Sequence, residues 1–160
     1  MKKYLFFPLA FWPFLAGLIV ENSVLNGVYG PWYAVDFALL IVWAAAAYFL
    51  AKYEPSAVKG FFILNVPMLA AWGVCFAQFH LKQTGLFSDG ALIWAQRFFM
   101  PMVGLSDIFA DIFFFFSDDF SFTYDAAFIL MIAAYITGHS LYLKRGILKR
   151  RLFSWLGDRI

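Results

Sequence analysis

The sequence predicts an all-α integral membrane protein: four transmembrane helices in two hairpins, a long outer loop that hugs the membrane and contains short helices, and a C-terminal amphipathic helix. The chain of 160 residues is 64% hydrophobic and only 14% charged, whereas a soluble domain usually carries about 25% charged residues. Apolar residues gather in stretches long enough to cross a bilayer, and the charges are sorted between the two ends of those stretches. These features argue against soluble, disordered and nucleic-acid-binding classes. All of residues 1–160 are expected to form one membrane domain.

Four stretches have the apolar length that a transmembrane helix needs, which is about 20 residues. The predicted spans cover residues 4–20, 32–51, 60–79 and 126–143. The first stretch also has the basic start and apolar core of a signal peptide. No small-residue cleavage site follows it, because the chain continues as "VENSVLNG", so a retained span is expected.

The distribution of charged residues predicts the orientation of the spans. Ten of the twelve lysines and arginines fall on one side of a four-span arrangement, and only Lys82 and Arg97 fall on the other. Eight of the ten acidic residues lie on or near that other side, and only Glu54 and Asp158 stay with the basic ones. Since basic loops stay in the cytoplasm, we expect a multi-pass protein of the cytoplasmic membrane with both termini in the cytoplasm.

The region from 81 to 125 is predicted to be an outer loop despite its apolar character. Its segment 91–116 is long enough to suggest a fifth span, but a fifth span would export either the basic tail or the basic loop 52–59. Pro101 and Gly104 divide this segment into two short helices. These helices either lie flat on the outer surface or dip in as a re-entrant hairpin. The flat arrangement is expected, because non-helical backbone inside a bilayer needs protein cover.

The last segment, 144–160, reads "KRGILKRRLFSWLGDRI" and interleaves basic with apolar residues. This pattern predicts a cytoplasmic amphipathic helix that lies on the anionic inner leaflet. The residues expected to contact anionic lipid are Lys149, Arg150 and Arg151. A docking site for a cytoplasmic partner is an open alternative.

An alanine-rich run in the second span offers a surface for close helix packing. The small residues that form it are Ala44, Ala47 and Ala51. This surface can serve contacts within the bundle, contacts between two copies of the chain, or a contact with another membrane protein.

Asp36 is the most informative acidic residue, because it lies about one turn inside the second predicted span. Its short side chain cannot reach far toward the headgroups, so it must face protein or a water-filled recess. Arg97 is the only arginine of the outer loop, and it is a natural partner for Asp36, Asp107 or Asp111. The sequence leaves open whether such a pair is structural or part of a functional site.

The stretch "DIFADIFFFF" places Asp107 and Asp111 four residues apart, which puts them on one face of a helix. Two carboxylates this close favour a cation site or proton transfer. The simpler alternative is the solvated face of an interfacial helix. Phe109 and the run Phe113–Phe116 are expected to anchor the loop against the outer leaflet or the bundle.

The two histidines lie near opposite ends of the predicted bundle. They are therefore too far apart to ligate one haem, and no cofactor is predicted. His80, at the outer end of the third span, could join the outer aspartates around a metal ion, although its spacing matches no standard metal motif. His139, beside Thr137 and Ser140 in the fourth span, is expected to make a hydrogen bond between helices.

No motif in the sequence names an enzymatic activity, because P-loop, GxSxG, HExxH and CxxC patterns are all missing. We expect a small non-enzymatic membrane protein: an accessory or regulatory subunit, or a minimal transport or ion-handling component with an acidic outer-facing site. The ion- or ligand-binding candidates are Asp36, His80, Arg97, Asp107 and Asp111. The alternative is a membrane-embedded hydrolase or transferase on a lipid-linked or peptide substrate, with Asp107 and Asp111 or Asp36 as acid and base. An immunity- or lysis-type protein would leave no mark in the sequence.

Overall fold

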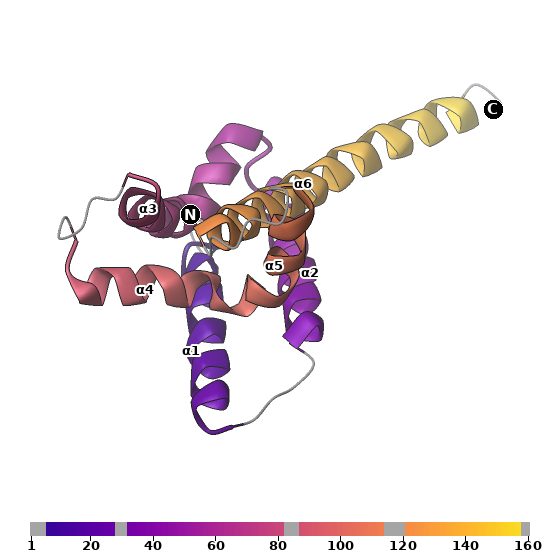
Figure 1. Cartoon of the computed structure of the whole chain (residues 1–160). Helices are drawn as coiled ribbons and strands as arrows, with labels where there is room; N and C mark the ends of the chain where they lie inside the picture. Colours follow the sequence, from indigo (N-terminus) through magenta and orange to yellow (C-terminus); the bar gives the residue numbers. More distant parts are fainter. Residues whose placement is uncertain (1–5, 28–31, 82–86, 114–120, 158–160) are drawn as a thin grey trace.

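The computed structural model describes residues 6–27, 32–81, 87–113 and 121–157, and every regular element in these ranges is a helix (Figure 1). The elements are η2 (Pro8–Phe11), α1 (Trp12–Leu25), α2 (Trp32–Ala51), α3 (Ala57–Phe79), α4 (Asp89–Phe99), η3 (Met100–Met102), α5 (Val103–Phe113) and α6 (Ser121–Gly157). Four stretches are long and apolar enough to cross a membrane: η2 with α1, most of α2, all of α3 and the first part of α6. The all-α class and the four long apolar helices are thereby confirmed.

The predicted bounds of the spans agree best with the structure in the middle of the chain. α2 has the predicted bounds, and α3 begins at Ala57, three residues before the predicted start. Ser56 explains the earlier start, because its hydroxyl accepts a hydrogen bond from the N–H of Lys59 at 3.4 Å and caps the first turn. α1 ends at Leu25, five residues later than predicted, and Gly27 follows it with a left-handed φ of +72°.

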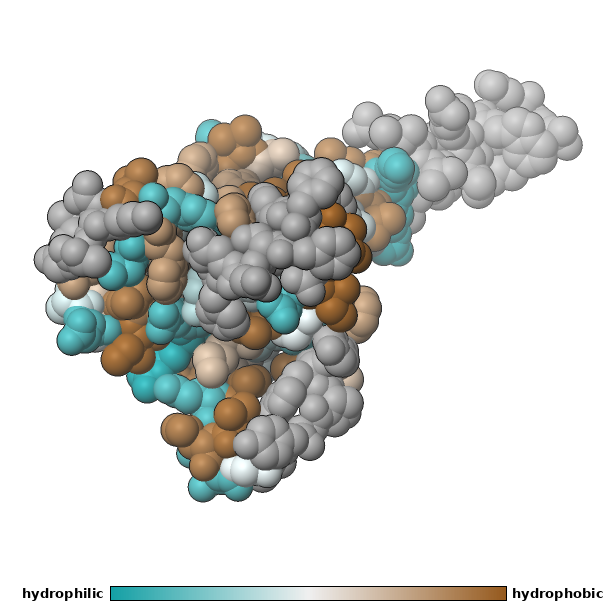
Figure 2. Space-filling view, viewed as in Figure 1, coloured by the Kyte–Doolittle hydropathy of each residue, from teal (hydrophilic) through white to brown (hydrophobic). Residues whose placement is uncertain are grey.

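Large apolar side chains cover the outside of the four long helices. Ile19 of α1, Ile41 of α2 and Val58 of α3 are each about two-thirds exposed, and Ile136 of α6 is more than half exposed. Figure 2 shows apolar surface of this kind in brown. A water-soluble protein seldom leaves so much apolar surface uncovered, which agrees with helices that face lipid.

α2 makes its most extensive contact with α6, and the two helices run in the same direction. Ala44 lies beside Gly138, and one turn further along both helices the rings of Tyr48 and Tyr142 lie 5.5 Å apart. Residue numbers therefore rise together along the contact. Four consecutive spans require this arrangement, because the second and fourth cross in the same direction.

α3 runs in the opposite direction to α6. The Tyr135 hydroxyl donates a hydrogen bond to the carbonyl oxygen of Ala57 at the start of α3. Near the other end of α3, the indole N–H of Trp72 donates to the carboxylate of Asp125. Residue numbers on the two helices therefore change in opposite senses, as expected for the third and fourth of four spans.

Small residues allow α2 and α6 to approach closely. A Cβ atom at Gly138 would lie 1.9 Å from the carbonyl oxygen of Ala44, so the backbones touch at this point. Ala47 and Ala51 are 0% and 1% exposed, and Ala44 is partly buried. The small-residue surface predicted on the second span therefore serves contacts within the chain, and its use by a second copy or another protein stays a prediction.

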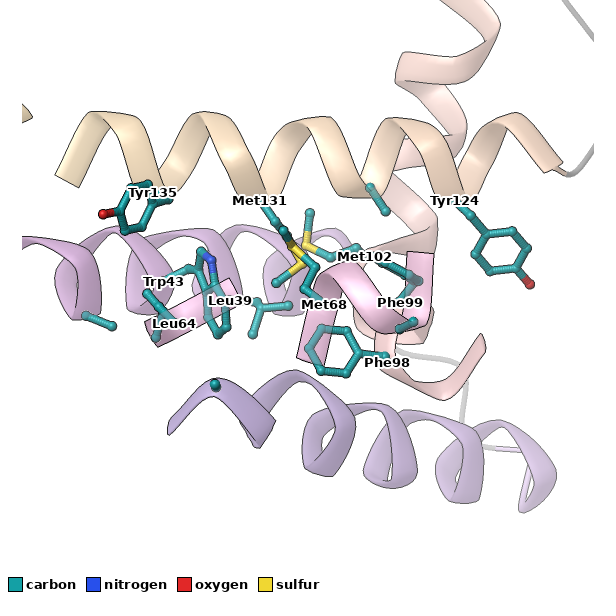
Figure 3. Close-up of a cluster of buried hydrophobic side chains, with 14 of the residues drawn as sticks. Leu39, Trp43, Leu64, Met68, Phe98, Phe99, Met102, Tyr124, Met131 and Tyr135 are labelled. Atoms are coloured by element: carbon teal, nitrogen blue, oxygen red, sulfur yellow. The ribbon is translucent and has the colours of Figure 1, made fainter. Parts of the chain in front are cut away.

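The segment between α3 and α6 folds into the bundle instead of lying flat on its surface. α4 contacts α1 and α3, η3 contacts α1 and α2, and α5 contacts α2 and α6. Phe98, Phe99 and Met102 are 0% exposed and belong to the same buried cluster as side chains of α2, α3 and α6 (Figure 3). These contacts favour the re-entrant alternative over the flat arrangement, and α4, η3 and α5 are called the re-entrant segment from here on.

Helical structure through the turn explains why this path is acceptable. Pro101 lies in η3 and Gly104 in the first turn of α5, where the sequence predicted a division. The backbone nevertheless stays helical from Asp89 to Phe113, so most of its polar groups bond within the segment. Pro101 and Met102 at the turn are buried by protein. The cost of unsatisfied backbone in a bilayer, which favoured the flat arrangement, is thereby avoided.

Gly17 allows α4 to cross α1 at backbone contact. A Cβ atom at this position would lie 1.8 Å from the carbonyl oxygen of Arg97, a separation that real Cβ atoms do not show. Any other residue at position 17 would push the two helices apart. The crossing therefore depends on this glycine, and it places Arg97 over the middle of α1.

α6 runs without a break from Ser121 to Gly157 and extends beyond the rest of the bundle (Figure 1). The predicted amphipathic helix of the tail is therefore a continuation of the fourth span instead of a separate element. Gly146 lies inside α6 without ending it, since one glycine costs a helix only about 1 kcal/mol. The side chains of Lys149, Arg150 and Arg151 lie outside the described residues, and their contact with anionic lipid stays a prediction.

Candidate functional site

Asp36 lies in the protein interior and holds the re-entrant segment. Its side chain is 1% exposed, and its Oδ2 atom accepts a hydrogen bond of 2.6 Å from the backbone N–H of Leu105. Leu105 lies in the first turn of α5, where N–H groups have no acceptor within that helix and the helix dipole favours a negative charge. Asp36 of α2 therefore caps α5. The prediction that Asp36 faces protein is confirmed, while its role as a ligand-binding residue stays a prediction.

A cavity of about 230 Å³ lies beside Asp36. Its walls come from α1, α2, the whole re-entrant segment and the start of α6. The polar side chains on the wall are Asp36, Gln96 and Tyr124, and valines with Met100 and Pro101 supply most of the remainder. The arrangement is a small apolar chamber with one buried carboxylate on its wall.

Arg97 pairs with Glu21, and not with Asp36, Asp107 or Asp111 as the sequence suggested. Its Nε and one terminal nitrogen donate to the two Glu21 oxygens at 2.6 and 3.1 Å, which is a bidentate geometry. Both side chains are partly exposed, at 35% and 26%.

The position of Gly17 explains why Arg97 pairs with Glu21. Glu21 follows Gly17 by four residues, so the two share a face of α1. Arg97 crosses α1 at Gly17 and therefore reaches Glu21. The sequence carries this spacing, but it becomes informative only once α4 is known to cross α1.

Asp107 connects α5 to the start of α6. The structure confirms that residues 107 and 111 lie on one helix, α5, and therefore share a face. Asp107 is exposed, and its Oδ1 atom accepts a hydrogen bond from the Thr123 hydroxyl at 3.2 Å. The side chains of Asp111 and Phe113 and the whole of Phe114–Phe116 lie outside the described residues, so the paired-carboxylate site stays a prediction.

His80 pairs with Asp125, which the sequence did not single out as a site residue. The His80 Nε2 atom lies 2.7 Å from Asp125 Oδ2, and the Trp72 indole N–H donates to Asp125 Oδ1 at 2.7 Å. Trp72, Phe76 and His80 are spaced by four residues, and this stripe on α3 could have indicated a shared partner. Within the described ranges, no group of three or more His, Cys, Asp or Glu side chains could hold a metal ion.

The hydrogen bond between helices predicted for His139 is not present in the described part of the chain. Its Nε2 atom is buried and has no hydrogen-bond partner there. The neighbouring Thr137 donates to the carbonyl oxygen of Ala133 on its own helix instead. One interhelical polar contact of the core is made by Trp43, whose indole N–H donates to Asn65 at 3.1 Å. Neither residue was predicted from the sequence.

Apolar side chains separate the polar groups at one end of the helix bundle from those at the other end. Leu39 of α2 follows Asp36 by three residues, and Met68, Met102 and Met131 from three other elements gather beside it (Figure 3). These side chains are at most 3% exposed. In the described part of the chain, Asp36, Asp107 and Asp125 each contact different partners.

Comparison with known proteins returned no relative. No family model matches the chain, and no curated protein and no solved structure matches it.

Proposed function

We propose that the chain is a multi-pass protein of the cytoplasmic membrane, with both termini in the cytoplasm, that binds a small ligand in the cavity beside Asp36. Its role would be that of an accessory or minimal transport component, not that of an enzyme. The basic residues support this orientation, because ten of the twelve fall at one end of the four long helices. The cavity then belongs to the outer half of the bundle, since it lies beside the C-terminal half of α1 and the N-terminal half of α2.

The buried carboxylate on the cavity wall carries the proposal. A carboxylate inside a membrane protein is expensive unless it is paired or hydrogen-bonded. Within the described residues, Asp36 accepts one hydrogen bond, from Leu105, and forms no ion pair. A carboxylate kept at this depth and facing an apolar chamber is typical of a binding site.

The same geometry gives less support to the alternative of a hydrolase or transferase. A pair of carboxylates that acts as acid and base must place both groups within hydrogen-bond reach of one substrate. Asp36 contacts Leu105, Asp107 contacts Thr123, and Asp125 contacts Trp72 and His80. These carboxylates bond to different helices and do not converge on one chamber.

Cysteine labelling tests both the orientation and the access to the cavity. In a Cys75→Ala background, Gln96→Cys on the cavity wall should react with a small membrane-impermeant thiol reagent added from outside. Ser88→Cys, at an exposed position, should react from the same side. Ala47→Cys, at a position that is 0% exposed, should stay unreactive from either side.

A second substitution shows whether Gln96→Cys reacts through the cavity. Val103→Phe fills the chamber with a larger ring and should slow the labelling of Gln96→Cys while it leaves Ser88→Cys unchanged. Labelling of Gln96→Cys and Ser88→Cys from the cytoplasmic side alone would contradict the orientation. Labelling of Gln96→Cys that is insensitive to Val103→Phe would contradict an accessible cavity.

A further inference from the structure

The charge of Asp36 is not balanced by a fixed cation in the described part of the chain. Arg97 is the cationic side chain nearest in sequence to the cavity residues of α4 and η3, and both oxygens of Glu21 engage it. The amide of Leu105 and the dipole of α5 offset part of the charge of Asp36. The Leu105 N–H satisfies only one of the two carboxylate oxygens of Asp36, and a carboxylate can accept several hydrogen bonds.

The walls of the cavity favour a ligand with an apolar body. Val20 and Val24 of α1, Val35 of α2 and Val103 of α5 all line it. An apolar group that moves from water to this surface gains about 25 cal/mol per Å² of buried area. Val24 lies near the C-terminal end of α1 and is 36% exposed, so this wall of the cavity adjoins the surface. In the proposed orientation that end faces the outer leaflet, from which an amphipathic molecule could enter.

The volume of the cavity limits the size of the ligand. A cavity of ~150 Å³ in another protein holds one benzene molecule. By proportion, a cavity of 230 Å³ holds a molecule of about nine non-hydrogen atoms. This volume excludes a whole lipid and leaves room for a single ring or a short chain with one polar group.

The polar groups on the wall discriminate between classes of ligand. Calcium takes six to eight oxygen ligands and magnesium demands an octahedral set, whereas the wall offers one carboxylate, one amide and one phenol. An anion would be repelled by the negative charge of Asp36. A single ammonium group needs few acceptors, because it carries at most three N–H donors, and Asp36 with the carbonyl oxygen of Gln96 could receive two of them.

We infer that the cavity selects a small amphipathic amine, whose ammonium group pairs with Asp36 while its apolar body packs against the valines. This inference rests on the proposed function, since it names the ligand class of the same site. Both compounds can donate a hydrogen bond to the Asp36 carboxylate, but only the amine adds an opposite charge, and a charged partner makes a hydrogen bond roughly twice as strong. An amine should therefore bind at least about ten-fold more tightly than a neutral alcohol of the same shape.

The test compares phenethylamine with phenethyl alcohol by isothermal titration calorimetry. The full chain is placed in phosphatidylcholine nanodiscs, and empty nanodiscs supply the blank for partition into lipid. The wild-type chain should prefer the amine at least about ten-fold. Asp36→Asn keeps an acceptor for the Leu105 N–H, so it should retain the fold and bind both compounds with equal affinity. Asp107→Asn, outside the cavity, should keep the preference of the wild type.

Cavity-filling variants show whether the compounds bind in the chamber. Val103→Phe and, at a partly exposed position, Val24→Phe should weaken both compounds about equally. In one outcome, the wild type binds the amine and the alcohol with equal affinity, while both Phe variants bind neither. This result would overturn the amine inference and leave the binding cavity in place. Amine binding that survives Asp36→Asn would also overturn it. If neither compound binds while Gln96→Cys is labelled from outside, the ligand class is wrong although the cavity is accessible.

Discussion

The crossing of α1 by α4 predicts that Gly17→Ala will be strongly destabilising. The added Cβ would lie 1.8 Å from the carbonyl oxygen of Arg97, and ordinary van der Waals contact begins at 3.4 Å. The two backbones must therefore separate by roughly 1.6 Å, the difference between these distances. A rotamer change cannot relieve the clash, because the atoms involved belong to the backbone and to a methyl group.

The expected cost follows from known effects of overpacking. Extra methyl groups in a well-packed core cost about 1–3 kcal/mol, and a clash with backbone belongs at the upper end. The separation also lengthens the Arg97–Glu21 contact, now 2.6 Å, although a partly exposed pair adds at most about 1 kcal/mol. We expect Gly17→Ala to lower the free energy of unfolding by about 3 kcal/mol.

Reversible unfolding in detergent micelles by sodium dodecyl sulfate, followed by circular dichroism, measures this loss. Gly73→Ala is the matched control, because it also lies in a long helix and a Cβ there meets nothing within 4 Å. That change should stabilise the chain by about 0.5–1 kcal/mol, as alanine favours a helix more than glycine does. If Gly17→Ala proves as stable as Gly73→Ala, α4 does not cross α1 and the re-entrant arrangement is refuted.

Two other contacts give predictions of the same kind. Gly138→Ala would place a Cβ 1.9 Å from the carbonyl oxygen of Ala44 and should cost about 2–3 kcal/mol of unfolding free energy, while Gly146→Ala, with nothing within 4 Å, should be neutral or stabilising. Equal stabilities of these two variants would contradict the close packing of α2 and α6. Asp125→Leu removes the partner of His80 and should cost about 1–3 kcal/mol in the same assay, with a smaller loss for Asp125→Asn. A loss from Asp125→Asn as large as that from Asp125→Leu would show that charge, and not hydrogen bonding, holds the contact.

The long helices were predictable from the sequence because apolar length is a local property. The bounds of α2 were correct, and α3 differed by one turn at Ser56, whose capping bond is local but weakly marked. The continuity of the helix beyond the fourth span was missed for a different reason. Basic residues from Lys144 onward suggested an end at the membrane surface, but a charged stretch can continue a helix as readily as an apolar one.

The path of residues 89–113 could not be derived from local pattern. The apolar residues of this segment would suit an interfacial helix or a buried one equally well, and the choice depends on what the other helices offer. Gly17 on α1 provides the space for α4, and Asp36 on α2 provides the acceptor for α5. Each of these residues lies more than 60 positions from its partner, Gly17 from Arg97 and Asp36 from Leu105. The partner of Arg97 was missed for the same reason, because Glu21 becomes its neighbour only through this packing.

Three polar contacts connect the re-entrant segment to three different helices. Arg97 bonds to α1 through Glu21, Leu105 bonds to α2 through Asp36, and Asp107 bonds to the start of α6. The same segment supplies much of the wall of the cavity, so the chamber has its observed shape only when the segment is seated between the helices.

Under the proposed function, ligand binding is therefore linked to the packing of the re-entrant segment between the long helices. A ligand that binds only the seated arrangement stabilises it, and by reciprocity any change that unseats the segment weakens the ligand. Asp36 is part of both effects, because one of its oxygens holds α5 and the carboxylate faces the chamber. A residue with both roles explains why an acidic side chain is kept at this depth. It also implies that a substitution at the distant Gly17 would lower affinity without touching the ligand.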